Sequence, residues 1–389
     1  MPEIISTADV DATIAELRAR PDVRYAVRNV HASATQAAKF IPNDPGRAGE
    51  AGGWRKTQWY LSGSASINAP AGWANLIAAG QPGARGVKIA ILDSGVAYKA
   101  APPRPASAEL PRARFLQGYD FIDNDSSPTD EFGHGTMVAA LVAGETGNKL
   151  GLAGIAYNAR IIPVRVLDSE GTGDATTIAR GIRYAVKKGA QLINLSLEFP
   201  EQYTARDIPQ LIDALRFARN RGVTTIVASG NSGLTRVPYP GRATTVIAVG
   251  ATTEHQCIAD YSNGGTALDL VAPGGGADGE FPDAGCVPEK ASGRGITQLT
   301  LIGDSLTRLG LASRDGTSMA APMVVGVAAG IIASGVIGKR PSPSAIKSRL
   351  QKTARDLGPT GFDTRYGHGL VDFAAATAPV VSVPVPPAE

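Results

Sequence analysis

Short apolar runs alternate with helically spaced segments through the middle of this 389-residue chain, and that alternation constrains its fold more than any other feature. The apolar runs are Lys88–Leu92, Arg160–Leu167, Leu192–Leu197, Thr224–Ala228 and Val246–Val249. The helical patterns are Thr176–Lys188, Asp207–Arg221 and Ala320–Ala333. Apolar strands interleaved with helices are typical of a parallel sheet covered on both faces. The sequence therefore predicts a three-layer α/β fold with a mostly parallel central sheet.

The charge of the chain is small and evenly spread. Its formal net charge of +3 comes from interspersed lysine and arginine residues, so we expect neither nucleic-acid nor membrane binding, and we expect a monomer. No stretch approaches the apolar length that we expect of a transmembrane helix. Residues 1–9 are polar and acidic, where a signal peptide would be basic and then apolar.

Three polar residues, Asp93, His134 and Ser318, each lie in a short segment that contains glycine. Asp93 ends the apolar run Val87–Leu92, so its carboxylate is predicted at the carboxyl end of a parallel strand, where open α/β sheets hold their sites. His134 and Ser318 each precede an apolar, small-residue stretch with helical character. Both are therefore predicted at helix N-termini.

These residue types together can make a serine nucleophilic. A serine hydroxyl is a poor nucleophile at neutral pH until an imidazole takes its proton, and a carboxylate on the far nitrogen sets the tautomer of that imidazole. The three residues are far apart in the sequence, so the fold has to bring them together. We predict that Ser318 is the nucleophile, that His134 is the base and then the acid, and that Asp93 orients His134.

The segments around these residues resemble those of the subtilisin-like serine proteases, and among them the thermitase-like branch. Asp, then His, then Ser is the chain order of subtilisin itself. The resemblance runs from about residue 43 to 376. It implies a subtilisin-like fold and a secreted, calcium-stabilised endopeptidase that forms an acyl-enzyme. The partners it implies are protein and peptide substrates and the enzyme's own propeptide or proteinaceous inhibitors.

Acyl transfer also needs hydrogen-bond donors for the oxygen that becomes negative. Asn231 follows the apolar strand and the turn Ser229-Gly230, and Ser-Gly-Asn resembles the oxyanion segment of the family. An asparagine after glycine is by itself a common turn residue. Its position between the histidine and serine segments favours the oxyanion role, with the backbone N–H of Ser318 as a second donor.

Substrate peptides of this family bind as an extra strand between two enzyme edges. The first edge is indicated by Gly171, Thr172 and Gly173, and the second edge with its side-chain pocket by Ser196, Leu197, Ala228, Ser229 and Gly230. Glu198 departs from the family, because glycine is expected after Ser-Leu. Its carboxylate could favour a basic substrate side chain, narrow the pocket, or turn outwards into solvent, and we expect the outward orientation.

Two segments resemble thermitase-like calcium sites. Alternating carboxylates and other oxygen groups in a tight loop suit a hard cation such as calcium, although a solvated acidic turn has the same composition. The first site is predicted at Asp120, Asp123, Asp125, Ser127 and Thr129. The second is predicted at Asp44, Glu145, Asn148, Leu150 and Leu152, with Glu109 as the nearest substitute for a missing family aspartate.

The chain is predicted to have three parts. Residues 1–40 resemble the second half of a subtilisin propeptide, with strands at Glu3–Ser6 and Arg24–Val30 around a helix at Val10–Arg20, or form an extension packed on the main domain. Residues 41–376 form the peptidase domain, in which the stretch from Pro273 to Ser313 is expected to be irregular. Residues 377–389 are a Pro/Val-rich tail.

Two features leave alternatives open. Cys257 and Cys286 are the only cysteines, and an even count permits one disulfide without requiring it. The function has two rivals: a proteolytically silent scaffold used for binding, and an esterase on a three-layer fold. Against an esterase, the segment around Ser318 is Gly-Thr-Ser-Met-Ala and not Gly-x-Ser-x-Gly.

Overall fold

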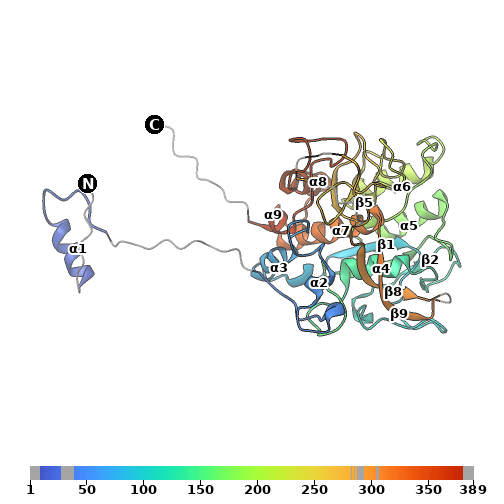
Figure 1. Cartoon of the computed structure of the whole chain (residues 1–389), viewed down its shortest axis with the longest axis horizontal. Helices are drawn as coiled ribbons and strands as arrows, with labels where there is room; N and C mark the ends of the chain where they lie inside the picture. The colour runs from blue at the N-terminus through green and yellow to red at the C-terminus, as the bar shows by residue number, and fades with distance from the viewer. Residues whose placement is uncertain are drawn as a thin grey trace. The chain divides into compact units, whose positions relative to one another are not determined.

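The structure is a computed structural model of the whole chain, and it describes residues 9–27, 39–281, 283, 285–286, 293–303 and 306–379 (Figure 1). The chain divides into two compact units, residues 1–37 and 38–389. In the first unit, α1 (Val10–Arg18) begins at Asp9, whose side chain accepts a hydrogen bond from the Ala12 N–H at 3.0 Å. This helix ends two residues before the predicted end.

Neither predicted strand of the first unit is confirmed. Glu3–Ser6 lies outside the described residues. Within Arg24–Val30, residues 24–27 form no strand, so that prediction is wrong for them, and 28–30 lie outside the described residues. Residues 25–27 alternate in burial, with Ala26 buried between Tyr25 and Val27, which are 61% exposed. The apolar residues that suggested a strand are therefore largely unburied within this unit.

A seven-stranded parallel sheet forms the centre of the second unit, in the order β2-β3-β1-β4-β5-β6-β7. Its strands are β1 (Lys88–Asp93), β2 (Tyr119–Asp120), β3 (Arg160–Arg165), β4 (Leu192–Leu195), β5 (Thr224–Ala228), β6 (Val246–Thr252) and β7 (Leu270–Pro273). The five predicted strands are confirmed with changes at their ends, whereas β2 and β7 were missed. The parallel sheet and its flanking helices confirm the predicted fold class.

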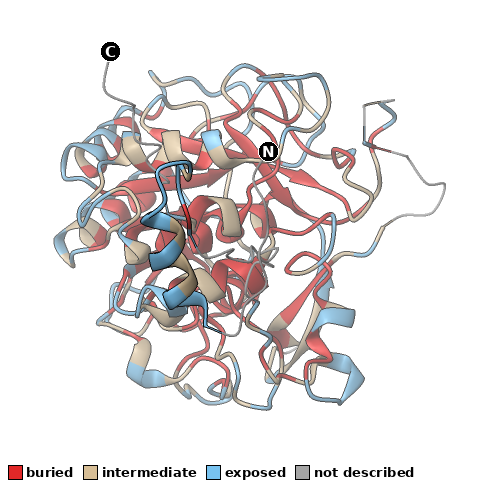
Figure 2. Cartoon of the chain, turned by 90° about the vertical axis from the view of Figure 1, so that its left-hand side faces the viewer, coloured by how far each residue is buried: buried red, intermediate tan, exposed pale blue. Residues whose placement is uncertain are grey.

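Both faces of the sheet are buried, as the continuous apolar runs predicted. Along β1, Ile89 and Ile91 join one hydrophobic cluster, while Ala90 and Leu92 join another. The first cluster contains α4 (His134–Ala143) and α7 (Thr317–Ser334), and the second contains α5 (Ala175–Lys187) and α6 (Pro209–Asn220). Figure 1 shows the sheet between these two helical layers, and Figure 2 shows that the buried residues gather in the strands and inner helices.

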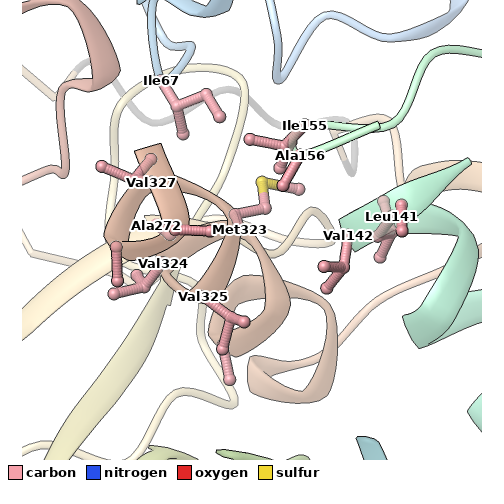
Figure 3. Close-up of a cluster of buried hydrophobic side chains, with 14 of the residues drawn as sticks. Ile67, Leu141, Val142, Ile155, Ala156, Ala272, Met323, Val324, Val325 and Val327 are labelled. Carbon is pink, nitrogen blue, oxygen red and sulfur yellow. The ribbon is translucent and has the colours of Figure 1, made fainter. Parts of the chain in front are cut away.

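The helix α7 lies in the middle of the first cluster. Its residues Met323, Val324, Val325 and Val327 pack among side chains from α4 and from the loops around Ile67 and Ile155 (Figure 3). Among the described residues it alone is long and apolar enough to cross a membrane, which corrects the expectation that no stretch approaches that length. The helix is 83% buried inside the fold, and that burial accounts for its apolar composition.

The stretch expected to be irregular holds an antiparallel hairpin, β8 (Ile296–Ile302) and β9 (Arg308–Arg314). Its two strands pair Leu299 with Leu311. The hairpin packs against α4, because the Gln298 side chain donates to the Ala140 carbonyl at 3.4 Å and the Thr300 hydroxyl donates to the Gly133 carbonyl. The prediction of an irregular stretch is therefore wrong for residues 296–302 and 308–313.

The remaining described elements lie at the periphery of the sheet. They are η1 (Gly46–Ala48), α2 (Trp54–Thr57), α3 (Ala69–Ala78), η2 (Pro82–Ala84), η3 (Arg112–Arg114), α8 (Pro343–Thr353) and α9 (Phe373–Thr377). Cys257 and Cys286 form a disulfide, so the bonded alternative is the one that the structure contains. Of the predicted tail, residues 380–389 lie outside the described residues.

Candidate active site

Asp93 is the last residue of β1, and β1 lies between β3 and β4. After β1 the chain builds one side of the sheet through β2 and β3, and it then crosses to build the other side from β4 onwards. Ligand sites of open α/β sheets form where the strand order reverses in this way, outside the carboxyl ends of the strands. The position of Asp93 follows directly from this topology.

His134 faces Asp93 at close range. It begins α4 after Gly133, which has φ of 90°. The Nδ1 atom of His134 lies 2.7 Å from Asp93 Oδ1, and the side chains are 17% and 1% exposed. A carboxylate can only accept, so Nδ1 carries the proton and Nε2 remains an acceptor. The predicted pairing of these two residues is present, in the tautomer that general-base chemistry requires.

A buried carboxylate, Asp130, holds the loop before His134. Its Oδ1 accepts hydrogen bonds from the Phe132 N–H at 3.0 Å and the Gly133 N–H at 2.8 Å. Its Oδ2 accepts from the Thr136 N–H at 2.9 Å. The Ser94 hydroxyl also donates to Asp130 Oδ1, at 2.8 Å. Asp130 is fully buried and joins the loop of the histidine to the end of β1.

Gly135 allows α4 to approach β1 closely. A Cβ atom at this position would lie 2.2 Å from the Gly95 carbonyl oxygen and 3.0 Å from the Asp93 Cβ. A side chain there would therefore push the helix away from the strand and lengthen the bond between His134 and Asp93. This contact explains the glycine that follows the histidine.

The surroundings of His134 change its affinity for a proton. Burial lowers the pKa of His134, but the charge and hydrogen bond of Asp93 and the charge of Asp130 raise it by more, so the pKa lies above the ordinary 6.5. Arg314 acts in the opposite direction and lowers the pKa. The imidazole is thus stabilised as a cation by two buried carboxylates.

Ser318 is the second residue of α7, and the end of β4 holds it from both sides. The Ser196 hydroxyl donates to the Ser318 carbonyl at 2.8 Å, and the Ser318 hydroxyl donates to the Ser196 carbonyl at 3.3 Å. Pro322 lies four residues further along and has no N–H, so the Ser318 carbonyl is free of the usual helical bond. The proline therefore makes this carbonyl available to Ser196.

Asn231 is oriented by the residue before Ser318. Its Oδ1 accepts from the Thr317 N–H at 2.8 Å and from the Thr317 hydroxyl at 2.9 Å. The side-chain oxygen is thereby used, which assigns the two N–H groups of Nδ2 as free donors. The backbone N–H of Ser318 lies in the first turn of α7, where N–H groups have no helical acceptor. Two donors of the type expected for an oxyanion site are thus held together.

These residues lie in one cleft of about 400 Å³. Three of the four candidate catalytic residues, His134, Asn231 and Ser318, line the cleft. Asp93 does not line it and contacts His134 from behind. Of the nine predicted substrate-binding residues, eight line the cleft: Gly171, Thr172, Gly173, Ser196, Leu197, Glu198, Ala228 and Gly230. Ser229 does not line it and is fully buried behind the wall.

Glu198 turns inwards, which corrects the expected outward orientation. Its Oε1 accepts from the Asn231 backbone N–H at 2.9 Å, and its Oε2 accepts from the Asn263 side chain at 3.3 Å. Two N–H donors on the opposite wall draw the carboxylate in, and solvent on the outer side offers no fixed donors of this kind. The structure therefore places the unexpected carboxylate inside the cleft.

In the first predicted calcium loop, an arginine pairs with two of the predicted ligands. The Arg165 Nη1 lies 3.0 Å from Asp120 Oδ2 and 2.9 Å from Asp123 Oδ2, and Nη2 lies 2.7 Å from Glu131 Oε2. Asp125 Oδ1 accepts from the backbone of Ser127, whose hydroxyl lies 3.3 Å from that of Thr129. The single guanidinium charge does not balance the carboxylates of Asp120, Asp123 and Asp125, and calcium binding by this loop stays a prediction.

The second predicted group is different, because the buried carboxylates of Asp44 and Glu109 lie there and neither pairs with an arginine of the described residues. Asp44 is fully buried and accepts from the Gly147 and Asn148 N–H groups at 2.8 and 3.1 Å. Glu109 is 6% exposed, and its Oε2 has no hydrogen-bond partner. Burial raises the pKa of Glu109 to about 7, with the charges of Asp44 and Glu145 adding to the effect.

The wider ligand set of the second group contains few further side-chain acids. Glu145 pairs with Arg114, and Asn148 Oδ1 accepts from the Leu150 N–H at 2.9 Å. Within the described ranges, no three His, Cys, Asp or Glu side chains are grouped to hold a metal. A cation here would need two carboxylates with amide and backbone oxygens, and the unpartnered oxygen of Glu109 fits that requirement.

Known proteins resemble this chain over most of its length. Residues 84–369 match the model of the subtilase family. A thermophilic serine proteinase from Bacillus sp. (strain AK1) is 32% identical over 364 residues, covering 94% of this chain and 75% of that protein. Thermitase from Thermoactinomyces vulgaris is 34% identical over 333 residues, covering 86% of this chain and 98% of that protein.

The likeness extends to solved structures. A protease from Pseudoalteromonas arctica PAMC 21717 superposes with a TM-score of 0.70 at 30% identity, covering 87% of this chain and 99% of that chain. With the parallel sheet and the cleft that holds a serine beside an Asp–His pair, these matches define the class as a serine protease, a hydrolase. The chain belongs to the subtilase family.

Several residues that shape the site were missed in the sequence. Asp130 and Thr317 hold the histidine loop and Asn231, and Asn263 holds Glu198. Arg165 pairs with Asp120 and Asp123 of the first predicted calcium loop. Asp130 lies four residues before His134, and Thr317 lies directly before Ser318. Their closeness to these motifs could have identified both residues in the sequence. No local pattern marks Asn263 or Arg165, because their partners are distant in the sequence.

Proposed function

We propose that this chain is a serine endopeptidase that hydrolyses peptide bonds through an acyl-enzyme formed on Ser318. The single observation that carries the proposal is the 2.7 Å contact between His134 Nδ1 and Asp93 Oδ1 in a cleft that also presents Ser318. The tautomer of His134 leaves Nε2 as the base. The family membership of the chain supports the same chemistry.

The steps follow from the positions of these groups. His134 Nε2 takes the proton of the Ser318 hydroxyl as the oxygen attacks the scissile carbonyl, and Asp93 stabilises the imidazolium that forms. His134 then gives that proton to the departing amine. Water enters, loses a proton to His134 and attacks the ester carbon. His134 then returns the proton to the Ser318 oxygen as its bond to the acyl carbon breaks, which releases the acid product and restores Ser318.

The negative oxygen of the tetrahedral intermediates is assigned to two donors. Asn231 Nδ2 is free to donate because Thr317 occupies Oδ1, and the Ser318 N–H is free because it lies in the first turn of α7. Donors fixed before the reaction need no reorganisation when the charge appears. This geometry favours acyl transfer over a silent binding role.

The substrate backbone is assigned to the space between two edges. Residues 171–173 and 196–198 line the cleft on its two sides, and an extended peptide between them would pair as an added strand. Asp168 fixes the first edge, because its side chain accepts from the Thr172 N–H at 2.9 Å. An unfolded protein segment suits this cleft, and the enzyme's propeptide or a proteinaceous inhibitor would compete for it.

We also propose one structural calcium site, at the second predicted group. The carboxylates of Asp44 and Glu109 would hold the ion, with the Asn148 side-chain oxygen and the backbone oxygens of Leu150 and Leu152. Glu145 already pairs with Arg114 and would offer its backbone oxygen. Calcium would neutralise two buried carboxylates and stabilise the folded state by binding it selectively.

The test compares the parent protein with Ser318→Ala on denatured casein, with fragments followed by mass spectrometry. We expect cleavage by the parent and none by the variant, because an alanine has no nucleophile. Casein separates a protease from an esterase, since activated esters are cleaved by both kinds of enzyme. A folded parent with intact Ser318 that leaves casein uncut would contradict the proposal and favour the silent scaffold.

A further inference from the structure

The carboxylate of Glu198 spans the two walls of the substrate cleft. The residue follows Ser196 and Leu197 beyond the end of β4. Its hydrogen-bond partners are Asn231, which lines the cleft, and Asn263, which is fully buried. It also lies directly against Gly230, where a Cβ atom would come within 1.9 Å of Glu198 Oε2. The carboxylate thus touches both the residue before Asn231 and the backbone of Asn231 itself.

This charge has no cationic partner among the described residues. Its donors, the Asn231 N–H and the Asn263 amide, are neutral, and no lysine, arginine or histidine of the described residues forms an ion pair with it. His134 is the other ionisable residue in the cleft lining. Burial raises the pKa of Glu198, and no neighbouring charge contributes to the shift. A half-buried carboxylate without a counter-charge favours binding of a cation.

The Glu198 carboxylate can accept further hydrogen bonds. An ionised carboxylate offers about four lone-pair positions, and the two amide donors occupy one position on each oxygen. An ammonium or guanidinium group of a substrate can use the remainder, which gives charge-assisted hydrogen bonds. The apolar lining contributed by Ala228, Phe199 and Ile178 suits the methylene stem of such a side chain.

We propose that Glu198 is the specificity-determining residue of this cleft and selects substrates with lysine or arginine at the residue whose carbonyl is attacked. This inference rests on the proposed endopeptidase function. The location identifies the substrate residue, because the attacked carbonyl lies between Ser318 and Asn231, and Glu198 contacts Asn231 directly. The side chain of that substrate residue is therefore the one nearest to the carboxylate.

The test uses peptide pairs that differ in one residue, with lysine or the neutral, similarly shaped norleucine before the scissile bond. We expect the parent to have a kcat/KM about tenfold or more higher for lysine, the effect of a close, partly buried charge pair. Glu198→Gln keeps an acceptor for Asn231 but removes the charge, so the lysine-to-norleucine ratio of kcat/KM should fall towards one. Glu201→Gln removes an exposed charge three residues away and should leave the preference intact.

Two results would overturn the inference while leaving the protease function standing. One is an equal lysine-to-norleucine ratio in the parent and Glu198→Gln. The other is an equal loss on both peptides in Glu198→Gln, which would make Glu198 a residue that positions Asn231. A parent that cleaves neither the peptides nor casein would instead overturn the proposed function, and this inference with it.

A measurement on the parent alone keeps the test valid if Glu198→Gln does not fold. Acidification protonates Glu198 and removes its charge, so the lysine-to-norleucine ratio should fall at acidic pH. Asn231 and Asn263, which face the carboxylate, do not titrate, and the titration of His134 affects both peptides equally and cancels in the ratio. A ratio that stays constant down to about pH 4, near the ordinary pKa of a glutamate, would contradict the inference.

Discussion

The Ser94 hydroxyl donates a hydrogen bond to Asp130 Oδ1 at 2.8 Å, and this bond ties the end of β1 to the loop that leads into α4. Ser94 also accepts from the Gly135 N–H at 3.0 Å. The residues beside Asp93 and His134 are therefore linked to each other independently of the Asp93–His134 contact. The relative position of the two proposed catalytic residues depends on a second, fully buried network.

Replacing Asp130 should destabilise the fold. In Asp130→Asn the amide nitrogen would face donors such as the Thr136 N–H, which Asp130 Oδ2 now accepts at 2.9 Å. Leaving buried donors unpaired costs on the order of 2–4 kcal/mol of unfolding free energy. Urea unfolding in a Ser318→Ala background, which prevents self-cleavage, measures the loss. Asp213→Asn, at an exposed ion pair with Arg216, is the control, and an equal effect of both changes would contradict the network.

The rise of kcat/KM with pH on the acidic side should depend on the charges around His134, because these charges set the pKa of His134. Catalysis requires neutral His134, and the pKa of His134 lies above 6.5, so kcat/KM should rise with pH through a midpoint above that value. Arg314 lowers this pKa, so Arg314→Gln should raise the pKa and move this rise to higher pH. Salt screens an exposed charge, so 1 M salt should shift the parent in the same direction. Arg308→Gln, on the same hairpin, should leave the midpoint unchanged, and a shift to lower pH in Arg314→Gln would refute the assignment.

Removing the side-chain donor of Asn231 should slow the chemical step. Asn231→Leu keeps the size of the side chain and loses the N–H groups, so we expect kcat to fall about 10²–10³-fold with little change in KM, the range found for this donor in subtilisin. Thr317→Val removes one of the two bonds to Asn231 Oδ1 and leaves the backbone bond, so its effect should be smaller. A variant Asn231→Leu with unchanged kcat would show that Asn231 is only a turn residue.

Calcium should raise the stability of the parent through Asp44 and Glu109. A concentration one hundred times the dissociation constant would add about 2.7 kcal/mol. Glu109→Gln removes one of two neighbouring buried carboxylates, so it should unfold at a higher temperature than the parent in excess chelator and gain less from calcium. Thermal unfolding in the Ser318→Ala background tests both effects. If Glu109→Gln gains as much as the parent, calcium binds elsewhere.

The sequence predicted elements whose pattern is local. The strands β1 and β5 are apolar on both faces, so their runs were continuous and easily recognised. The hairpin was missed because its exposed and half-buried positions interrupt any such run, and β9 has no fully buried residue. The two residues of β2 are too short to show a period.

The same limit applies to the site. Asp93, His134 and Ser318 lie in segments whose glycines and helix starts are visible along the chain. The inward turn of Glu198 depends on Asn263, and Asp120 pairs with Arg165, which lies 45 residues further along the chain. Such pairs form only when the strands are placed side by side, so a pattern within one segment cannot reveal them.

The central position of α7 has a consequence for the order of synthesis. The helix that carries Ser318 fills the core against the sheet, and the residues that complete its surroundings, such as Phe373, come later still in the chain. A chain that leaves the ribosome step by step therefore has Asp93 and His134 long before it has a nucleophile. Ser318 is made after all seven strands of the sheet, so a growing polypeptide has no nucleophile with which to cut its neighbours or itself until the whole sheet has been synthesised.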